Sequence, residues 1–213
     1  MRYSHITRRQ MMFGVAHAAA GMALVSSCAS SGGRGSAEAR PVGFKIGACD
    51  WTIGKRTDPA SLEVAKRIGL DGVQIDLGRG QVDLPLFDRG MQQKYIEARQ
   101  THEIERASLA LGVLNNIPYK SDPRAERWVD KSIDGCKALV VDRVLVAFFG
   151  EGDLKDERKG TDVVVKRFRK VAPKAEDAGV TLAIESWLSA EQHMEIIERV
   201  GLPAVKVYYD VAN

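Results

Sequence analysis

Two acidic residues each follow a β-rich run in the last part of the sequence. Glu185 comes directly after Thr-Leu-Ala-Ile at 181–184, and Asp210 comes directly after Val-Lys-Val-Tyr-Tyr at 205–209. The segment between the two runs has the apolar spacing of an amphipathic helix. In a strand–helix–strand unit the strands are parallel, so their carboxyl ends lie at the same edge of a sheet. We therefore expect the side chains of Glu185 and Asp210 to lie close together.

Such a pair of carboxylates has two kinds of explanation. Acidic groups at the ends of apolar strands lose hydration, and a divalent cation compensates that loss well. The same acids could instead cap helices or pair with Lys or Arg. On the residues alone, both a metal or catalytic role and a structural role stay open. In either case two converging carboxylates repel each other, so the pKa of at least one should be raised when no metal is bound.

Four further residues follow predicted strands and could contact a substrate. They are Trp51, Asn115, Glu151 and Trp187. The two tryptophans could stack on a sugar ring or simply pack at the edge of the sheet. Asn115 could bind a substrate, although turn formation explains an Asn at this place better. Asp76 also ends a strand, and its expected role is a salt bridge.

An alternation of strands and helices positions these residues. We predict strands over 44–49, Gly72–Asp76, 107–114, Arg143–Phe148, 181–184 and 205–209. We predict helices over 59–68, 91–102, 123–139, 162–178 and 189–200, the fourth kinked at Pro173. The strands are apolar on both faces, as in parallel sheets that helices cover. The spacing of the units matches one step of an eight-fold βα barrel, which has about 250 residues.

Two features bear on this fold assignment. An open doubly wound sheet is the rival, but the turn after the first strand, 50–54, has no GxGxxG. Only six strands are predicted, so two βα units of a (β/α)8 TIM barrel should lie beyond Asn213. We therefore interpret the sequence as C-terminally truncated. Six unclosed strands should expose edges, fold poorly and catalyse nothing by themselves.

Composition narrows the class of protein. The 213 residues, 45% of them apolar, suffice for one domain with a sizeable core. Outside 1–28, which contains Arg2, Arg8 and Arg9 and no acid, 28 basic residues balance 28 acidic ones. This neutral body disfavours nucleic acid as a partner. Cys49 and Cys136 show no zinc-site spacing and are expected to be small, buried and unpaired.

The first residues have the features of an export signal. Arg8-Arg9 before a weakly apolar segment resembles a twin-arginine signal over 1–28, and Val-Ser-Ser-Cys at 25–28 resembles a lipobox that would lipidate Cys28. Cleavage near Ala29 and a free periplasmic protein is the alternative. Residues 29–41 are predicted to be a flexible linker and 42–213 the partial barrel domain. We expect membrane contact only through the signal or a lipid anchor.

Taken together, these motifs resemble the sugar phosphate isomerase/epimerase family of xylose isomerase-like TIM barrels. The resemblance spans about 44–213 and rests on four stretches: GVQIDLG at 72–78, ALGVLNNIPY at 110–119, TLAIES at 181–186 and VYYDVAN at 207–213. Exported members with a twin-arginine signal are especially similar. The stretches are short and degenerate, and it is their order and spacing that carry the match.

The resemblance implies one divalent metal ion, held by a Glu after strand 5, an Asp after strand 6, a His after strand 7 and a Glu after strand 8. Glu185 and Asp210 match the first two, and the others would lie beyond Asn213. Many members have a His where this chain has Asn213. The ion would be Mn²⁺, with Mg²⁺, Co²⁺ or Zn²⁺ as alternatives.

The implied function is isomerisation or epimerisation of a sugar or keto-sugar through an enediolate. The metal would hold the substrate oxygens, and Glu185 would be both a ligand and the base. The partner would be a small-molecule sugar, and a homo-oligomer stays open. One alternative is a metal-dependent phosphodiesterase of the endonuclease IV type, but His102 and His193, the only histidines of the body, are expected on helix surfaces away from the site. A non-catalytic exported sugar-binding barrel is the other.

Overall fold

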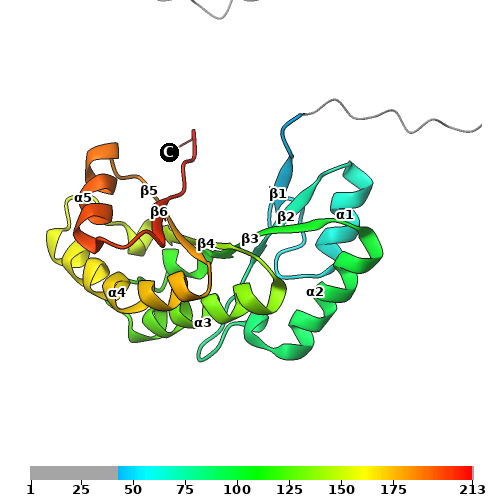
Figure 1. Cartoon of the computed structure of the whole chain (residues 1–213), viewed down its shortest axis with the longest axis horizontal. Helices are drawn as coiled ribbons and strands as arrows, with labels where there is room; N and C mark the ends of the chain where they lie inside the picture. The colour runs from blue at the N-terminus through cyan, green and yellow to red at the C-terminus, as the bar shows by residue number, and fades with distance from the viewer. Residues whose placement is uncertain (1–42, 213) are drawn as a thin grey trace, which may run out of the picture. The chain divides into compact units, whose positions relative to one another are not determined.

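A single parallel sheet dominates the computed structural model, which describes residues 43–212 (Figure 1). Within these residues six strands pair in chain order, β1-β2-β3-β4-β5-β6. A doubly wound sheet would reverse its strand order at a switch point, whereas this sheet never does. The order confirms a partial barrel of the TIM type and excludes the rival fold. The predicted signal, the linker and Cys28 lie outside the described residues.

The strands and helices alternate as predicted. The strands are β1 (Gly47–Cys49), β2 (Gly72–Asp76), β3 (Glu105–Leu111), β4 (Arg143–Phe148), β5 (Thr181–Ser186) and β6 (Val205–Val207). The helices are α1 (Ala60–Ile68), α2 (Arg89–His102), α3 (Pro123–Leu139), α4 (Arg158–Asp177) and α5 (Ala190–Val200). Short 3₁₀ turns η2 (Pro85–Phe87), η3 (Gly112–Asn115) and η4 (Gly150–Gly152) lie in the loops.

Several predicted boundaries were wrong. The first strand was predicted from residue 44, but pairing begins at Gly47, opposite Gly72, and Phe44 is 99% exposed. The third strand begins two residues earlier than predicted and ends at Leu111, because the chain turns there into η3. The fourth helix begins at Arg158 rather than at 162, and Pro173 lies inside it.

The helix starts have identifiable caps. The Asp88 side chain accepts a hydrogen bond from Met91 N at 2.9 Å and begins α2 two residues before the prediction. Ser189 and Gln192 form a capping box at the start of α5. This box fixes where the helix follows β5, the strand that carries Glu185.

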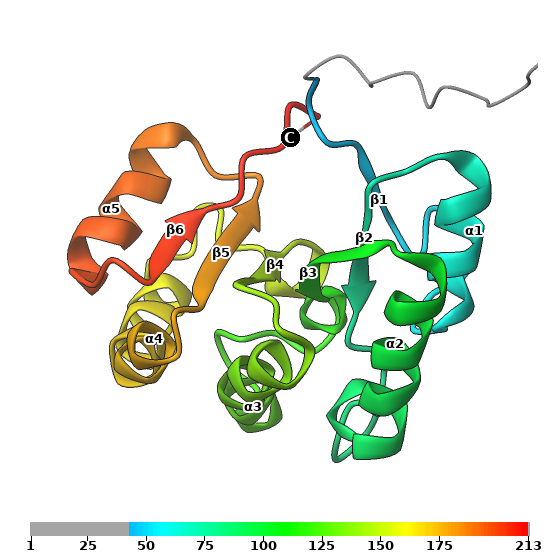
Figure 2. The ribbon, with the colours of Figure 1, turned by 45° about the vertical axis from the view of Figure 1, so that its right-hand side comes forward.

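The two faces of the sheet have different environments. In Figure 2 the helices lie on the outer side of the curved sheet. Outward-facing strand residues pack against them in one large core that includes Val73, Ile75, Leu109, Val146, Leu182 and Ile184. On the inner face a small cluster of Ala110, Leu145 and Ala147 packs with rings from the strand ends. The inner face therefore remains free to line a cavity.

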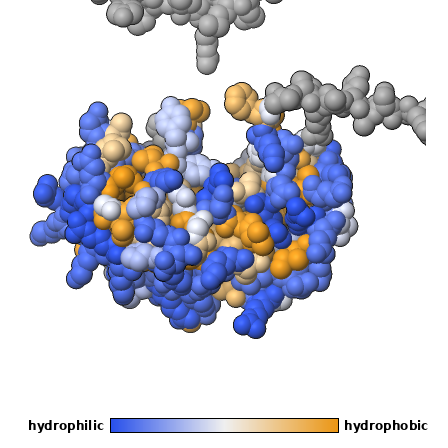
Figure 3. Space-filling view, in the orientation of Figure 1, coloured by the Kyte–Doolittle hydropathy of each residue, from blue (hydrophilic) through white to orange (hydrophobic). Residues whose placement is uncertain are grey.

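The outer surface is mostly polar. On the face shown in Figure 3, hydrophilic residues cover most of the periphery and apolar residues gather nearer the middle. On α1, Leu62 and Ala65 are fully buried, whereas Ile68 at the last turn is 57% exposed. Among the described residues, no helix is both long enough and apolar enough to cross a membrane.

Candidate active site at the carboxyl ends of the strands

Strands β5 and β6 bring Glu185 and Asp210 together. Ile184 pairs with Val207, and Tyr208 N donates to Ile184 O at 2.7 Å, so the pairing extends beyond β6. Glu185 thus lies beside Tyr208, two residues before Asp210. The carboxyl groups of Glu185 and Asp210 are close enough to share a hydrogen bond. The proximity expected from the strand ends is present.

The electrostatics of this pair follow from its surroundings. Burial, followed by the charge of Asp210 and the shared hydrogen bond, raises the pKa of Glu185 to about 7. Oxygen donors that converge in this way fit a hard divalent cation, which would remove the repulsion between them. Within residues 43–212 no group of three or more His, Cys, Asp or Glu could hold a metal ion.

A cavity of about 650 Å³ opens in front of the pair. Its walls include the rings of Trp51, Phe149 and Trp187, and its lining also includes Glu185 and Asp210. The rings of Phe149 and Trp187 meet edge to face with centroids 5.1 Å apart. Apolar ring faces beside two carboxylates suit a ligand that has both C–H and O–H groups. Both predicted tryptophans therefore lie where a substrate could touch them.

The other two predicted contact residues do not line this cavity. Asn115 Oδ1 accepts a hydrogen bond from Phe149 N at 3.3 Å and so ties η3 to the end of β4. Glu151 lies on η4 and is exposed. The structure thus gives Asn115 the turn role that its residue type favoured, and it does not bring Glu151 to the pair.

Sequence reasoning missed a buried acid after β1. Asp50 is fully buried, and its Oδ2 accepts hydrogen bonds from Thr57 N at 2.8 Å and Asp76 N at 3.0 Å. Burial raises the pKa of Asp50 to about 6, against these two hydrogen bonds. Asp76 forms the salt bridge expected of it, since Arg56 Nη1 lies 2.7 Å from Asp76 Oδ2. An acid directly after a strand was the available signal, as for Glu185.

A polar network crosses the inner face below the cavity. Gln74 Oε1 accepts from Cys49 Sγ at 3.1 Å, and Gln74 Nε2 donates to Ser108 Oγ at 2.8 Å and to the Tyr208 hydroxyl at 3.4 Å. The prediction that Cys49 is a buried apolar residue was wrong, because its side chain is only half-buried and lines the cavity. Burial and nearby acids raise the pKa of this thiol to about 11, which keeps it protonated.

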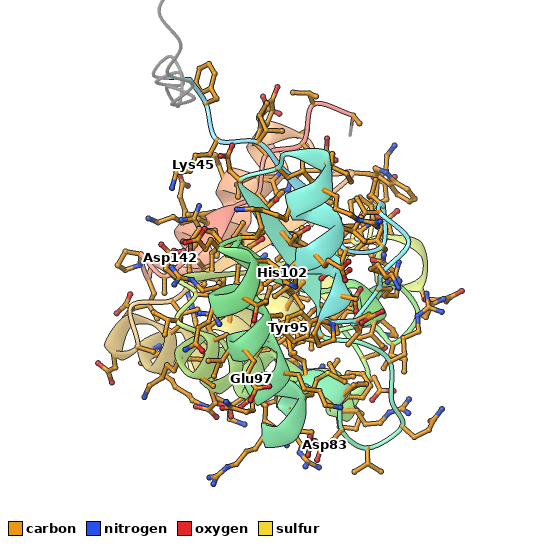
Figure 4. The ribbon with its side chains drawn as sticks, turned by 90° about the vertical axis from the view of Figure 1, so that its right-hand side faces the viewer. Lys45, Asp83, Tyr95, Glu97, His102 and Asp142 are labelled. Atoms are coloured by element: carbon orange, nitrogen blue, oxygen red, sulfur yellow. The ribbon has the colours of Figure 1, made fainter. Side chains whose placement is uncertain are left out.

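The surface position predicted for His193 was also wrong. His193 is 8% exposed, with Nε2 2.9 Å from Ser186 Oγ and Nδ1 3.1 Å from Ser189 O. A carbonyl oxygen only accepts, so Nδ1 carries the proton and Ser186 donates to Nε2. Burial lowers the pKa of His193, in keeping with a neutral ring. His102, by contrast, is the last residue of helix α2, where Figure 4 labels it.

Comparisons with known proteins agree with this fold. A family model described as xylose isomerase-like TIM barrel matches residues 62–213. A 2-epi-5-epi-valiolone 7-phosphate 2-epimerase from Actinoplanes sp. is 24% identical over 170 residues, which are 79% of this chain and 62% of that protein.

Solved structures show the same fold. A xylose isomerase domain protein from Planctomyces limnophilus has a TM-score of 0.62 at 16% identity, over 80% of this chain and 64% of the other. A xylose isomerase-like TIM barrel protein from Mycobacterium smegmatis in complex with magnesium has a TM-score of 0.64 at 14% identity, over 80% of this chain and 65% of the other. The chain thus spans less than two thirds of the length of these relatives. Because the family model covers most of the chain, the chain belongs to the family of xylose isomerase-like TIM barrels.

Proposed function

We propose that the protein is a sugar isomerase or epimerase that moves a proton at a carbon next to a carbonyl group. The observation that carries this function is the Glu185–Asp210 pair in a cavity walled by aromatic rings. Relatives support it: besides the valiolone phosphate epimerase, a D-psicose 3-epimerase from Clostridium cellulolyticum H10, solved with D-tagatose, shares the fold with a TM-score of 0.61 at 17% identity, over 77% of this chain and 62% of the other.

In this proposal Glu185 is the base. Its carboxylate takes a proton from the carbon beside the carbonyl, the C–H electron pair moves into the bond between the two carbons, and the carbonyl oxygen takes up the negative charge. Delivery of a proton to the same carbon from the opposite face by a second acidic group gives an epimer. Return of the proton to the former carbonyl carbon, with transfer of the neighbouring hydroxyl proton to the former carbonyl oxygen, gives an isomer.

Glu185 and Asp210 would also hold a divalent metal ion. The magnesium complex of the Mycobacterium smegmatis protein supports a divalent ion, and Mn²⁺ is our proposal for this chain. When bound, such an ion supplies positive charge that polarises the carbonyl group of the substrate. Asp210 would bind the ion rather than take the proton, since Glu185 is the acid that lies within β5 and whose pKa burial raises.

The charge of the cavity supports an uncharged sugar as substrate. Its lining within residues 43–212 contains the two carboxylates Glu185 and Asp210 but no Lys or Arg. The lining residues described therefore offer a phosphate group no cationic side chain to pair with. The same charge distribution disfavours the phosphodiesterase alternative.

Deuterium exchange tests the function. We expect the intact protein with Mn²⁺ in D₂O to exchange the hydrogen next to the carbonyl in at least one free sugar of a panel that includes D-allulose and D-tagatose, as followed by NMR. Glu185→Gln keeps the shape but removes the base, so exchange should fall at least a hundredfold, on the scale of a lost general base. Glu97→Gln on the outer helix α2 is the control and should exchange normally (Figure 4). Exchange in no sugar of the panel, or undiminished exchange by Glu185→Gln, would contradict the function.

We also propose export by the twin-arginine route. Arg8-Arg9 before a weakly apolar segment supports it, and Cys28 would be lipidated. Replacing both arginines by Lys in a reporter fusion should keep the reporter in the cytoplasm, and unchanged export of that variant would exclude the route. Fatty-acid labelling that Cys28→Ala abolishes would identify a lipoprotein.

A further inference from the structure

Tyr208 lies next to Glu185 on the inner face of the sheet. Tyr208 N bonds to Ile184 O at 2.7 Å, which continues the pairing of Ile184 with Val207 by one residue. Ile184 faces the helices in the large core, so Glu185 and its strand neighbour Tyr208 face the other way. The Tyr208 ring accordingly packs with the inner cluster and lines the cavity.

Gln74 lies on β2 and reaches the Tyr208 hydroxyl across the inner face of the curved sheet. Gln74 is 6% exposed, and its carbonyl accepts the Cys49 thiol at 3.1 Å. Its amide nitrogen donates one hydrogen to Ser108 Oγ at 2.8 Å and directs the other at the Tyr208 hydroxyl at 3.4 Å. Both amide hydrogens and the carbonyl are thus occupied, so the orientation of the amide is determined by its three partners.

The hydrogen bond from Gln74 determines which further hydrogen bond the Tyr208 hydroxyl can make. A phenol has one hydrogen to donate, and its oxygen here accepts from Gln74. Within residues 43–212 no group accepts a hydrogen bond from the Tyr208 hydroxyl. Its hydrogen is therefore left for the cavity that Tyr208 and Glu185 line together.

We propose that Tyr208 is a substrate-contacting residue that donates a hydrogen bond to a hydroxyl or carbonyl oxygen of the sugar, and that Gln74 is its positioning residue. Glu185 and Asp210 can only accept hydrogen bonds when they are ionised, so the cavity needs a neutral donor beside them. The Tyr208 hydroxyl meets that need without attracting an anion. This role rests on the sugar chemistry proposed for the same cavity.

Removing one atom tests the contact. Tyr208→Phe in the intact protein with Mn²⁺ should lower kcat/KM roughly three- to thirtyfold, for the sugar of the panel that the wild type turns over fastest, because one hydrogen bond is lost. Its Mn²⁺ affinity by calorimetry and its melting temperature should stay close to those of the wild type. The matched control is Tyr119→Phe, whose hydroxyl is buried behind the sheet without a partner among the described residues. That control should leave kcat/KM unchanged.

A double-mutant cycle tests the positioning role. Gln74→Met keeps the size but removes the amide hydrogens, so kcat/KM should fall in the wild-type background. In the Tyr208→Phe background the same change should cause little further loss, because the hydroxyl that it orients is gone. Additive losses in the two backgrounds would remove Gln74 from the proposal.

The outcomes separate this role from the function on which it rests. An active wild type with an equally active Tyr208→Phe variant would overturn the role of Tyr208 alone. A parallel loss of Mn²⁺ affinity and kcat/KM would overturn it too, because Tyr208 would then act on the metal ligands rather than on the sugar. A wild type that turns over no sugar would overturn the function and this contact together.

Discussion

At the scale of single residues, the strand ends hold acids in three different environments. Glu185 is placed beside Asp210, and burial together with that neighbour raises its pKa to about 7. Asp76 has a guanidinium partner in Arg56. Asp50 has two backbone N–H donors but no cation in contact, and its Oδ1 is buried without a partner among the described residues. An acidic residue at a strand end can therefore line a cavity, form a salt bridge or hold a loop.

The environment of Asp50 leads to a pH-dependence of stability. Its folded pKa of about 6 exceeds the ordinary value of 3.8, so the folded state binds the proton more tightly than the unfolded state does. This contribution is fully present below about pH 4 and is lost as the pH rises through about 6, by up to about 3 kcal/mol. Asp50→Asn should remove that dependence, as measured by urea unfolding of both proteins from pH 4 to 7.

Asp142 provides a control, because its contribution to stability changes with pH in the direction opposite to that of Asp50. Arg143 lowers the pKa of Asp142, an exposed residue at the start of β4 (Figure 4). Its contribution is present above its ordinary pKa and is lost as the pH falls, so Asp142→Asn should remove a loss of stability at low pH. A difference between wild type and Asp50→Asn that stays constant from pH 4 to 7 would contradict the raised pKa of Asp50.

At the scale of elements, the connection from β5 to α5 is held by a relay of hydrogen bonds. Leu188 N donates to Ser186 Oγ at 3.1 Å, and Ser186 donates to His193 Nε2 at 2.9 Å. His193 Nδ1 then donates to Ser189 O at 3.1 Å. This relay fixes the loop that carries Trp187, the ring at the cavity wall.

Removing the central hydroxyl should loosen that loop. Ser186→Ala leaves Leu188 N and His193 Nε2 without their partner, so we expect a loss of about 1–3 kcal/mol of unfolding free energy. Quenching of Trp187 fluorescence by iodide should rise, with Trp51→Phe as the background, since Trp128 is fully buried.

Another buried serine is the matched control for this change. Ser132 donates only to Val129 O, at 2.7 Å within α3, so Ser132→Ala should cost less and leave the quenching unchanged. Equal losses in the two variants would mean that the relay adds nothing to the loop.

At the scale of the whole molecule, much of the fold could be predicted from the sequence. Alternating apolar runs and helix signals placed each strand, and parallel pairing then implied that Glu185 and Asp210 meet. The inner-face network of Gln74, Cys49 and Tyr208 could not be predicted, because strands that are apolar on both faces do not reveal which residues face inward. His193 was missed for a related reason: its partner, Ser186, belongs to a strand end whose direction depends on the folded loop.

We propose that Glu185 and Asp210 form a metal site that also moves protons. Calorimetric titration of the intact protein with Mn²⁺ tests it most directly, in the wild type, Glu185→Gln, Asp210→Asn and the outer-helix control Glu97→Gln. We expect both site variants to bind Mn²⁺ at least tenfold more weakly, which corresponds to about 1.4 kcal/mol, while the control binds as the wild type does. Equal affinity in all four proteins would show that these two acids are structural and would contradict the account.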